Sequence, residues 1–120
     1  MNNDLRERTY LFARRIYRLF NALPNRSGPQ TIGKQLLRSG TSVGANYLEA
    51  NRARSRAEFI STLGICLRES EETVFWLKLM RDEQILEAQL LEPIIQEASE
   101  LIAIFTTSIK TAKSGKQNNI

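Results

Sequence analysis

Histidine is absent from this sequence of 120 residues, and cysteine occurs once. Without histidine there can be no Ser–His or Cys–His nucleophile pair, no histidine general base and no histidine-containing zinc or di-iron site. A single cysteine can form neither an internal disulfide nor a cysteine-rich zinc site. These absences remove most familiar kinds of catalysis, and the low cysteine content fits a reducing cytoplasm.

Long hydrophobic runs are also absent. The longest apolar stretch, residues 101–105, is far shorter than the ~18 residues that a membrane span requires. The N-terminal region carries charges throughout and contains no continuous apolar core, unlike a secretory signal peptide. We therefore expect a cytoplasmic protein without a membrane partner.

Proline and glycine are few, and the segments between them show helical periodicity. In four segments, apolar residues recur at steps of three and four, the spacing of one buried stripe on a helix. Four helices joined by short loops predict an all-α fold, an up-down-up-down four-helix bundle over residues 1–112. Residues 113–120 are polar and aperiodic, so we expect a disordered tail. The expected helices span about residues 5–23, 29–51, 55–81 and 88–110.

Capping and breaking residues set these boundaries. Pro24 ends the first helix, because the residue before a proline avoids the α region. Pro29 fits the first position of the second helix. Ser55 and Glu58 form a capping box at the start of the third. Pro93 belongs in the first two turns of the fourth helix or marks a local kink.

Two glycines inside the second expected helix need an explanation. Gly40 and Gly44 each cost about 1 kcal/mol relative to alanine in a helix interior. One explanation is the close approach of another helix or another subunit. The other explanation is a kink or a break in the helix.

The net charge of +4 hides an uneven distribution. Residues 1–60 contain eleven basic and four acidic residues, a net charge of +7, and ten of the eleven are arginine. Residues 61–120 contain six basic and nine acidic residues, a net charge of −3. Arginine suits phosphate and carboxylate partners because its guanidinium is planar and can bind them through two hydrogen bonds. An arginine-rich half therefore favours an acidic partner, with nucleic acid first, or else a solvated face with internal ion pairs.

The second and third helices are expected to be antiparallel around a short turn. Residues equally far from the turn then face each other, which places Arg38 opposite Glu69 and Glu72. Asn46 and Glu49 share the face of Arg38, because they follow it at helical spacings. We expect these five residues to form a polar network that sets the register of the hairpin.

Arginines form two candidate nucleic-acid contacts. Those on the first helix fall within about a third of its circumference, and those near the second turn form a second basic cluster. Tyr10 and Tyr17 lie on another face of the first helix, and no known RNA-binding motif is present. The first set comprises Arg8, Arg14, Arg15 and Arg18, and the second comprises Arg52, Arg54 and Arg56.

No set of residues indicates catalysis. The acidic pairs 71–72 and 82–83 are adjacent in sequence, so their side chains point in different directions on a helix. Cys66 lies on the apolar stripe of the third helix and is expected to be a small core residue. We therefore expect no catalytic residue, no metal site and no cofactor.

Residues 38–46 (RSGTSVGAN) and 49–53 (EANRA) carry a family resemblance. They resemble the central signature of the bacterial four-helix-bundle proteins encoded in intervening sequences of 23S ribosomal RNA genes. The similarity continues through Phe59 and Trp76 and covers about residues 5–110. The family is similar in fold to the accessory protein of diversity-generating retroelements, which binds a reverse transcriptase and RNA.

The resemblance implies a four-helix protomer of a ring-like homopentamer, and no catalytic residue is carried over from the family. In such a ring, the subunit interface would use Gly40, Gly44, Phe75 and Trp76. Our leading hypothesis is a non-enzymatic, RNA- or nucleic-acid-associated oligomer. The alternative is a protein-interaction scaffold, for example for a reverse transcriptase or a ribosome-associated protein.

Overall fold

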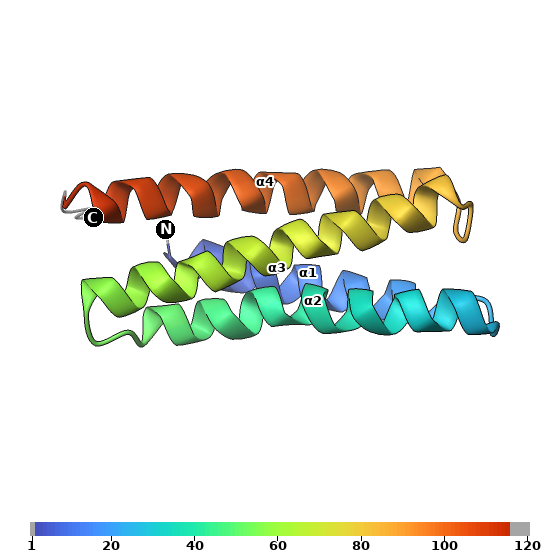
Figure 1. Ribbon diagram of the computed structural model, residues 1–120, viewed down its shortest axis with the longest axis horizontal. Helices are drawn as coiled ribbons and strands as arrows, with labels where there is room; N and C mark the ends of the chain where they lie inside the picture. Colours follow the sequence, from blue (N-terminus) through green and yellow to red (C-terminus); the bar gives the residue numbers. More distant parts are fainter. Residues whose placement is uncertain (1, 116–120) are drawn as a thin grey trace.

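A computed structural model describes residues 2–115 and contains four α-helices. Figure 1 shows the α1–α2 and α3–α4 connections at one end of the elongated molecule and the α2–α3 connection at the other. The described residues contain no strand, so the expected all-α fold is confirmed. The helices are α1 (Asn2–Asn21), α2 (Ser27–Asn51), α3 (Arg56–Asp82) and α4 (Ala88–Lys113).

The helix starts follow the capping residues closely. Ser55 Oγ accepts a hydrogen bond from the Glu58 backbone N–H at 3.0 Å, which caps α3 as expected. The helix α2 begins at Ser27, so Pro29 is its third residue rather than its first. A proline is tolerated there because the first-turn N–H groups have no partner within the helix. Pro93 lies near the start of α4.

The end of α3 reverses the chain toward α4. Gln84 adopts a positive φ of 58°, and the Ile85 N–H donates to Met80 O at 2.9 Å. The Gln84 N–H donates to Arg81 O at 3.1 Å, which completes a Schellman motif. At the other end of α4, Lys113 is its last residue, and residues 116–120 of the expected tail lie outside the described part of the chain.

Apolar side chains from all four helices form one core. At the centre, the largest of them are almost completely shielded from solvent, as the sequence periodicity predicts. Tyr47 from α2 packs against Phe105 from α4 at a ring-centroid distance of 6.1 Å, so non-adjacent helices also meet in the core. The central residues are Phe12, Ile16, Leu36, Val43, Leu63, Leu77, Leu91, Leu101 and Phe105.

The glycines of α2 allow α1 to approach closely. A Cβ atom at Gly40 would lie 2.7 Å from Ile16 Cγ1, and one at Gly44 would lie 3.2 Å from Thr9 Oγ1 and 3.3 Å from Thr9 O. The helix α2 is continuous through both positions, so the expected alternative of a helix break is wrong. Contact with another helix of the same chain therefore accounts for both glycines without a second subunit.

Among adjacent helices, α1 and α4 pack most weakly. The helix α2 packs extensively on α1 and α3, and α3 packs extensively on α4, whereas the backbones of α1 and α4 approach each other at only a few positions. The polar contacts across this α1–α4 seam therefore matter for how α1 is held.

Candidate nucleic-acid interface

Arg8 spans the α1–α4 seam. Its Nε donates to Glu97 Oε2 at 2.7 Å, and its terminal nitrogen donates to Glu97 Oε1 at 3.0 Å and to Glu100 Oε1 at 2.5 Å. The hydrogen bond with Glu97 is the largest cause that raises the pKa of Arg8 above its ordinary value. The structure thus differs from the expectation for this residue, because Arg8 is occupied by two carboxylates rather than available to a phosphate.

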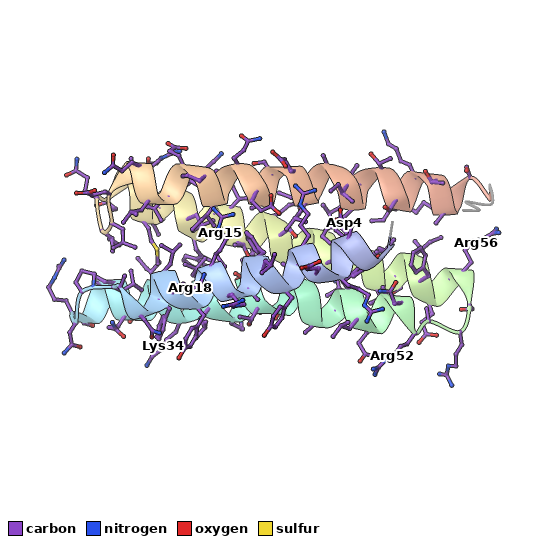
Figure 2. The ribbon with its side chains drawn as sticks, turned by 180° about the vertical axis from the view of Figure 1, so that it is seen from behind. Asp4, Arg15, Arg18, Lys34, Arg52 and Arg56 are labelled. Atoms are coloured by element: carbon purple, nitrogen blue, oxygen red, sulfur yellow. The ribbon has the colours of Figure 1, made fainter. Side chains whose placement is uncertain are left out.

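The other three arginines of the expected α1 contact have no ion pair within the described residues. Arg14 and Arg18 are exposed, and Arg15 is half-buried. Figure 2 looks onto α1 and shows Arg15 and Arg18 along it. These cations remain available to an acidic partner.

The second basic cluster lies at the α2–α3 connection, where Arg52, Arg54 and Arg56 are all exposed. Only Arg54 faces a carboxylate, with 3.8 Å between its Nε and Glu58 Oε1. Its side chain is 90% exposed, so this pair is weak. Arg56 reaches the end of α4, since its guanidinium lies 3.5 Å from where a Cβ on Gly115 would be.

A compact polar cluster joins α2 to α3. Arg38 contacts Glu69 Oε1 at 3.4 Å and Glu72 Oε2 at 2.5 Å, and the Trp76 indole N–H donates to Glu72 Oε2 at 3.1 Å. The indole hydrogen bond and then the Arg38 contact lower the pKa of Glu72 below its ordinary value. Because Arg38 is half exposed, the cluster fixes register more than it adds stability.

Two residues of the expected network lie outside this cluster. Asn46 Nδ2 donates to Ser42 O at 2.8 Å, within α2 itself. Glu49 is exposed, and its side chain has no hydrogen-bond or ion-pair partner in the described part of the chain. Sharing a helical face with Arg38 therefore does not bring the side chains of Asn46 and Glu49 into contact with α3.

Sequence reasoning missed a buried hydroxyl pair between α2 and α3. Thr73 Oγ1 lies 2.9 Å from Ser39 Oγ and 2.7 Å from Glu69 O, and both hydroxyl residues are fully buried. The sequence feature that indicates this pair is the polar Ser39 in the middle of an apolar stripe, because a buried hydroxyl requires a hydrogen-bond partner.

Cys66 and the carboxylates offer no reactive centre. Cys66 is fully buried, and burial raises the pKa of its thiol to about 12, so the nucleophilic thiolate is scarce. Within residues 2–115 no three metal-ligating side chains gather at one place. None of the described helices is long and apolar enough to cross a membrane.

Phe75 and Trp76 form an aromatic pair on the outer side of α3. Their ring centroids lie 4.9 Å apart in an edge-to-face arrangement, and Phe75 is 60% exposed. Trp76 is partly buried against the core, so Phe75 is the exposed member of the pair, and an exposed aromatic ring of this kind fits a surface that meets a partner.

Four packed helices with unpaired arginines on the surface define a small helical-bundle protein. The sequence model described as 23S rRNA-intervening sequence protein matches residues 1–107, and the chain belongs to this family. A crystal structure of a protein of unknown function from the S23 ribosomal protein family of Bacteroides thetaiotaomicron is similar, with a TM-score of 0.85 and 38% identity. That match covers 92% of this chain and 98% of the other. No curated protein matches the chain.

Proposed function

We propose that the protein is a non-enzymatic, RNA-associated protomer of a homo-oligomer. The observation that carries the proposal is the set of unpaired arginines, since five of the seven expected contacts face no carboxylate in the described residues. The family description, which names 23S rRNA, supports RNA as the acidic partner. The five arginines are Arg14, Arg15, Arg18, Arg52 and Arg56.

The proposed assembly is a ring of up-down-up-down protomers, with five copies in line with the family resemblance. The exposed Phe75, packed edge-to-face on the partly buried Trp76, supports an apolar subunit contact on α3. In a ring, each basic surface repeats in every subunit, so weak phosphate contacts add through multivalency.

Binding of a structured RNA across a salt series tests the proposal. The logarithm of the affinity should fall linearly with the logarithm of the salt concentration, because phosphate contacts release counterions. Arg14→Gln and Arg18→Gln should each make the slope shallower, whereas Lys78→Gln, an exposed cation on α3, is the matched control. A flat salt response, or no binding at low salt, contradicts the proposal.

A protein-interaction scaffold is the second candidate function, and the exposed Phe75 ring on α3 favours it. Its partner would be a protein such as a reverse transcriptase or a ribosome-associated factor. A pull-down with nuclease treatment separates the two candidates, because a protein partner survives the nuclease. In that case, reversing charges on α1 should spare binding.

A further inference from the structure

A groove of about 610 Å³ runs along the outer surface between α1 and α2. Its lining includes the small residues Ala13, Gly44 and Ala45 and the larger side chains of Tyr10 and Leu48. The groove exists because these small side chains leave the surface hollow between two closely packed helices. Its lining is mainly apolar, although Arg6 and Glu7 reach its edge.

Two tyrosines on α1 border the hollowed surface. Tyr10 and Tyr17 are 64% and 56% exposed, and neither ring has a hydrogen bond or a ring contact in the described residues. They lie seven residues apart on one face, about 10 Å along the helix. Ala13 lies between them, and a second hollow of about 360 Å³ extends from Ala13 to Tyr17, Arg14 and Arg18.

Cations surround the two rings. Arg6, Arg14 and Arg18 are exposed on α1 and have no ion pair within the described residues. Figure 2 shows Lys34 of α2 and Arg52, which directly follows α2, toward opposite ends of the same view. Glu7 is the single acidic residue in the lining of the two hollows. The surface thus combines flat aromatic faces with a basic border.

We infer that this α1–α2 surface binds single-stranded nucleic acid, with bases stacked on Tyr10 and Tyr17 and phosphates at the surrounding arginines. The inference rests on the proposed RNA function and specifies the form of RNA that it requires. Aromatic stacking beside a basic groove is how proteins hold unpaired strands. The two tyrosines are separated by about 10 Å along the helix axis, which leaves room for an unpaired base at each ring.

The chemistry of this surface argues against a two-fold contact between copies of the chain and against a duplex. In a two-fold contact, the same basic surface would face itself and bring arginines together, whereas the head-to-tail contacts of the proposed ring join different faces and are tested separately below. A base-paired duplex would engage the arginines but would keep its base faces stacked inside, so the tyrosines would contribute nothing. An unpaired strand is the partner that uses both features.

The test uses the full chain and a fluorescently labelled run of twelve uridines, with a blunt RNA duplex of equal length for comparison. Tyr10→Ala and Tyr17→Ala should each weaken uridine-strand binding by about 5- to 150-fold, the range for one lost stacking contact. Tyr10→Phe and Tyr17→Phe should retain most of the affinity, because phenylalanine keeps the stacking face. Leu90→Ala, which removes an exposed apolar side chain on α4, is the matched control and should change nothing.

The salt dependence of binding separates the role of the tyrosines from that of the arginines. The tyrosine variants should keep the wild-type salt slope, because they remove no phosphate contact, and duplex binding should be insensitive to them. If both RNAs bind with a steep salt slope but the tyrosine variants match wild type, the RNA function stands and this inference is overturned. If neither RNA binds at low salt, the proposed function itself fails.

Two further results overturn the inference by identifying another occupant. In the first, Tyr10→Ala converts an oligomer to monomers in light scattering and leaves RNA affinity unchanged, so a second copy fills the groove. In the second, Tyr10→Ala abolishes a nuclease-resistant protein complex and leaves RNA affinity unchanged, so a protein fills it.

Discussion

At single positions of α2, the absence of a side chain determines how closely α1 can pack. A Cβ atom at Gly40 would overlap Ile16, whereas one at Gly64, within α3, would meet nothing closer than Arg68 at 3.9 Å. Both glycines lie inside helices and cost backbone entropy. The cost at Gly40 is offset by close packing, and the cost at Gly64 is not.

Alanine substitutions at the two glycines should therefore have opposite effects. Gly40→Ala must displace Ile16 or separate the helices, and overpacking of this kind costs about 1–3 kcal/mol. Gly64→Ala should instead raise the free energy of unfolding by about 1 kcal/mol through helix propensity. Urea denaturation monitored by circular dichroism measures both. Equal effects of the two substitutions would contradict the close-packing explanation.

The single tryptophan reports on the ionisation of one carboxylate. The Trp76 indole N–H donates to Glu72, whose folded-state pKa is lowered by that bond and by Arg38. A lowered carboxyl pKa contributes stability above the unfolded-state pKa, and this contribution is lost as pH falls through the folded-state pKa. We expect Trp76 fluorescence to change with a midpoint below 4.5, the ordinary value for glutamate.

The same titration identifies the group responsible. Glu72→Gln should abolish the fluorescence change, because the side chain no longer ionises. Glu100→Gln removes a carboxylate on α4 whose pKa is also lowered, by Gln96 and Arg8, and should leave the Trp76 titration intact. A midpoint above 4.5 in the wild-type protein would contradict the assignment.

At the scale of helices, the sequence predicted elements and local pairing better than long-range contacts. Apolar periodicity located all four helices to within a few residues, because one buried stripe leaves a strong pattern. The α2–α3 hairpin placed Arg38 opposite the two glutamates that it contacts, since a short turn restricts the register. The Arg8–Glu97 pair could not be foreseen, because the register of α1 on α4 depends on the packing of the whole bundle.

Among the contacts between helices, those of Arg8 should cause the largest loss of stability when they are removed. Arg8→Met leaves Glu97, whose side chain is only 18% exposed, without its partner, and we expect a loss of about 1–2 kcal/mol in unfolding free energy. Arg14→Met removes an exposed, unpaired arginine of the same helix and should stay within about 0.5 kcal/mol of wild type. Hydrogen exchange should show faster opening of α1 in Arg8→Met alone. Equal stability of the two variants would show that the seam does not depend on Arg8.

At the scale of the whole molecule, part of the charge asymmetry is satisfied internally. Arg8 and Arg38 of the basic half pair with carboxylates of the acidic half, on α4 and α3 respectively. The unpaired arginines of the basic half lie on α1, at the α2–α3 connection and, as Arg26, at the α1–α2 connection. The outer side of α3 presents aromatic surface instead, so the molecule offers two chemically different faces.

Assembly of the whole molecule should depend on the aromatic face. Phe75→Glu is expected to lower the molecular mass measured by light scattering while circular dichroism stays unchanged, because Phe75 is 60% exposed in the protomer. Leu90→Glu is the matched control, since Leu90 is an exposed leucine on α4 and should leave assembly unaffected. A wild-type protein that is monomeric at micromolar concentration would contradict the proposed oligomer.

The buried thiol of Cys66 can report how often the bundle opens. A reagent can reach this sulfur only after the bundle opens, because α3 lies between α2 and α4 and the side chain has no exposed area. With one cysteine in the chain, the reaction should follow a single exponential. When reclosing is faster than labelling, the observed rate is the intrinsic thiol rate multiplied by the open fraction. The labelling rate from a colorimetric thiol assay, divided by the intrinsic thiol rate, therefore gives the fraction of time that each protomer spends open.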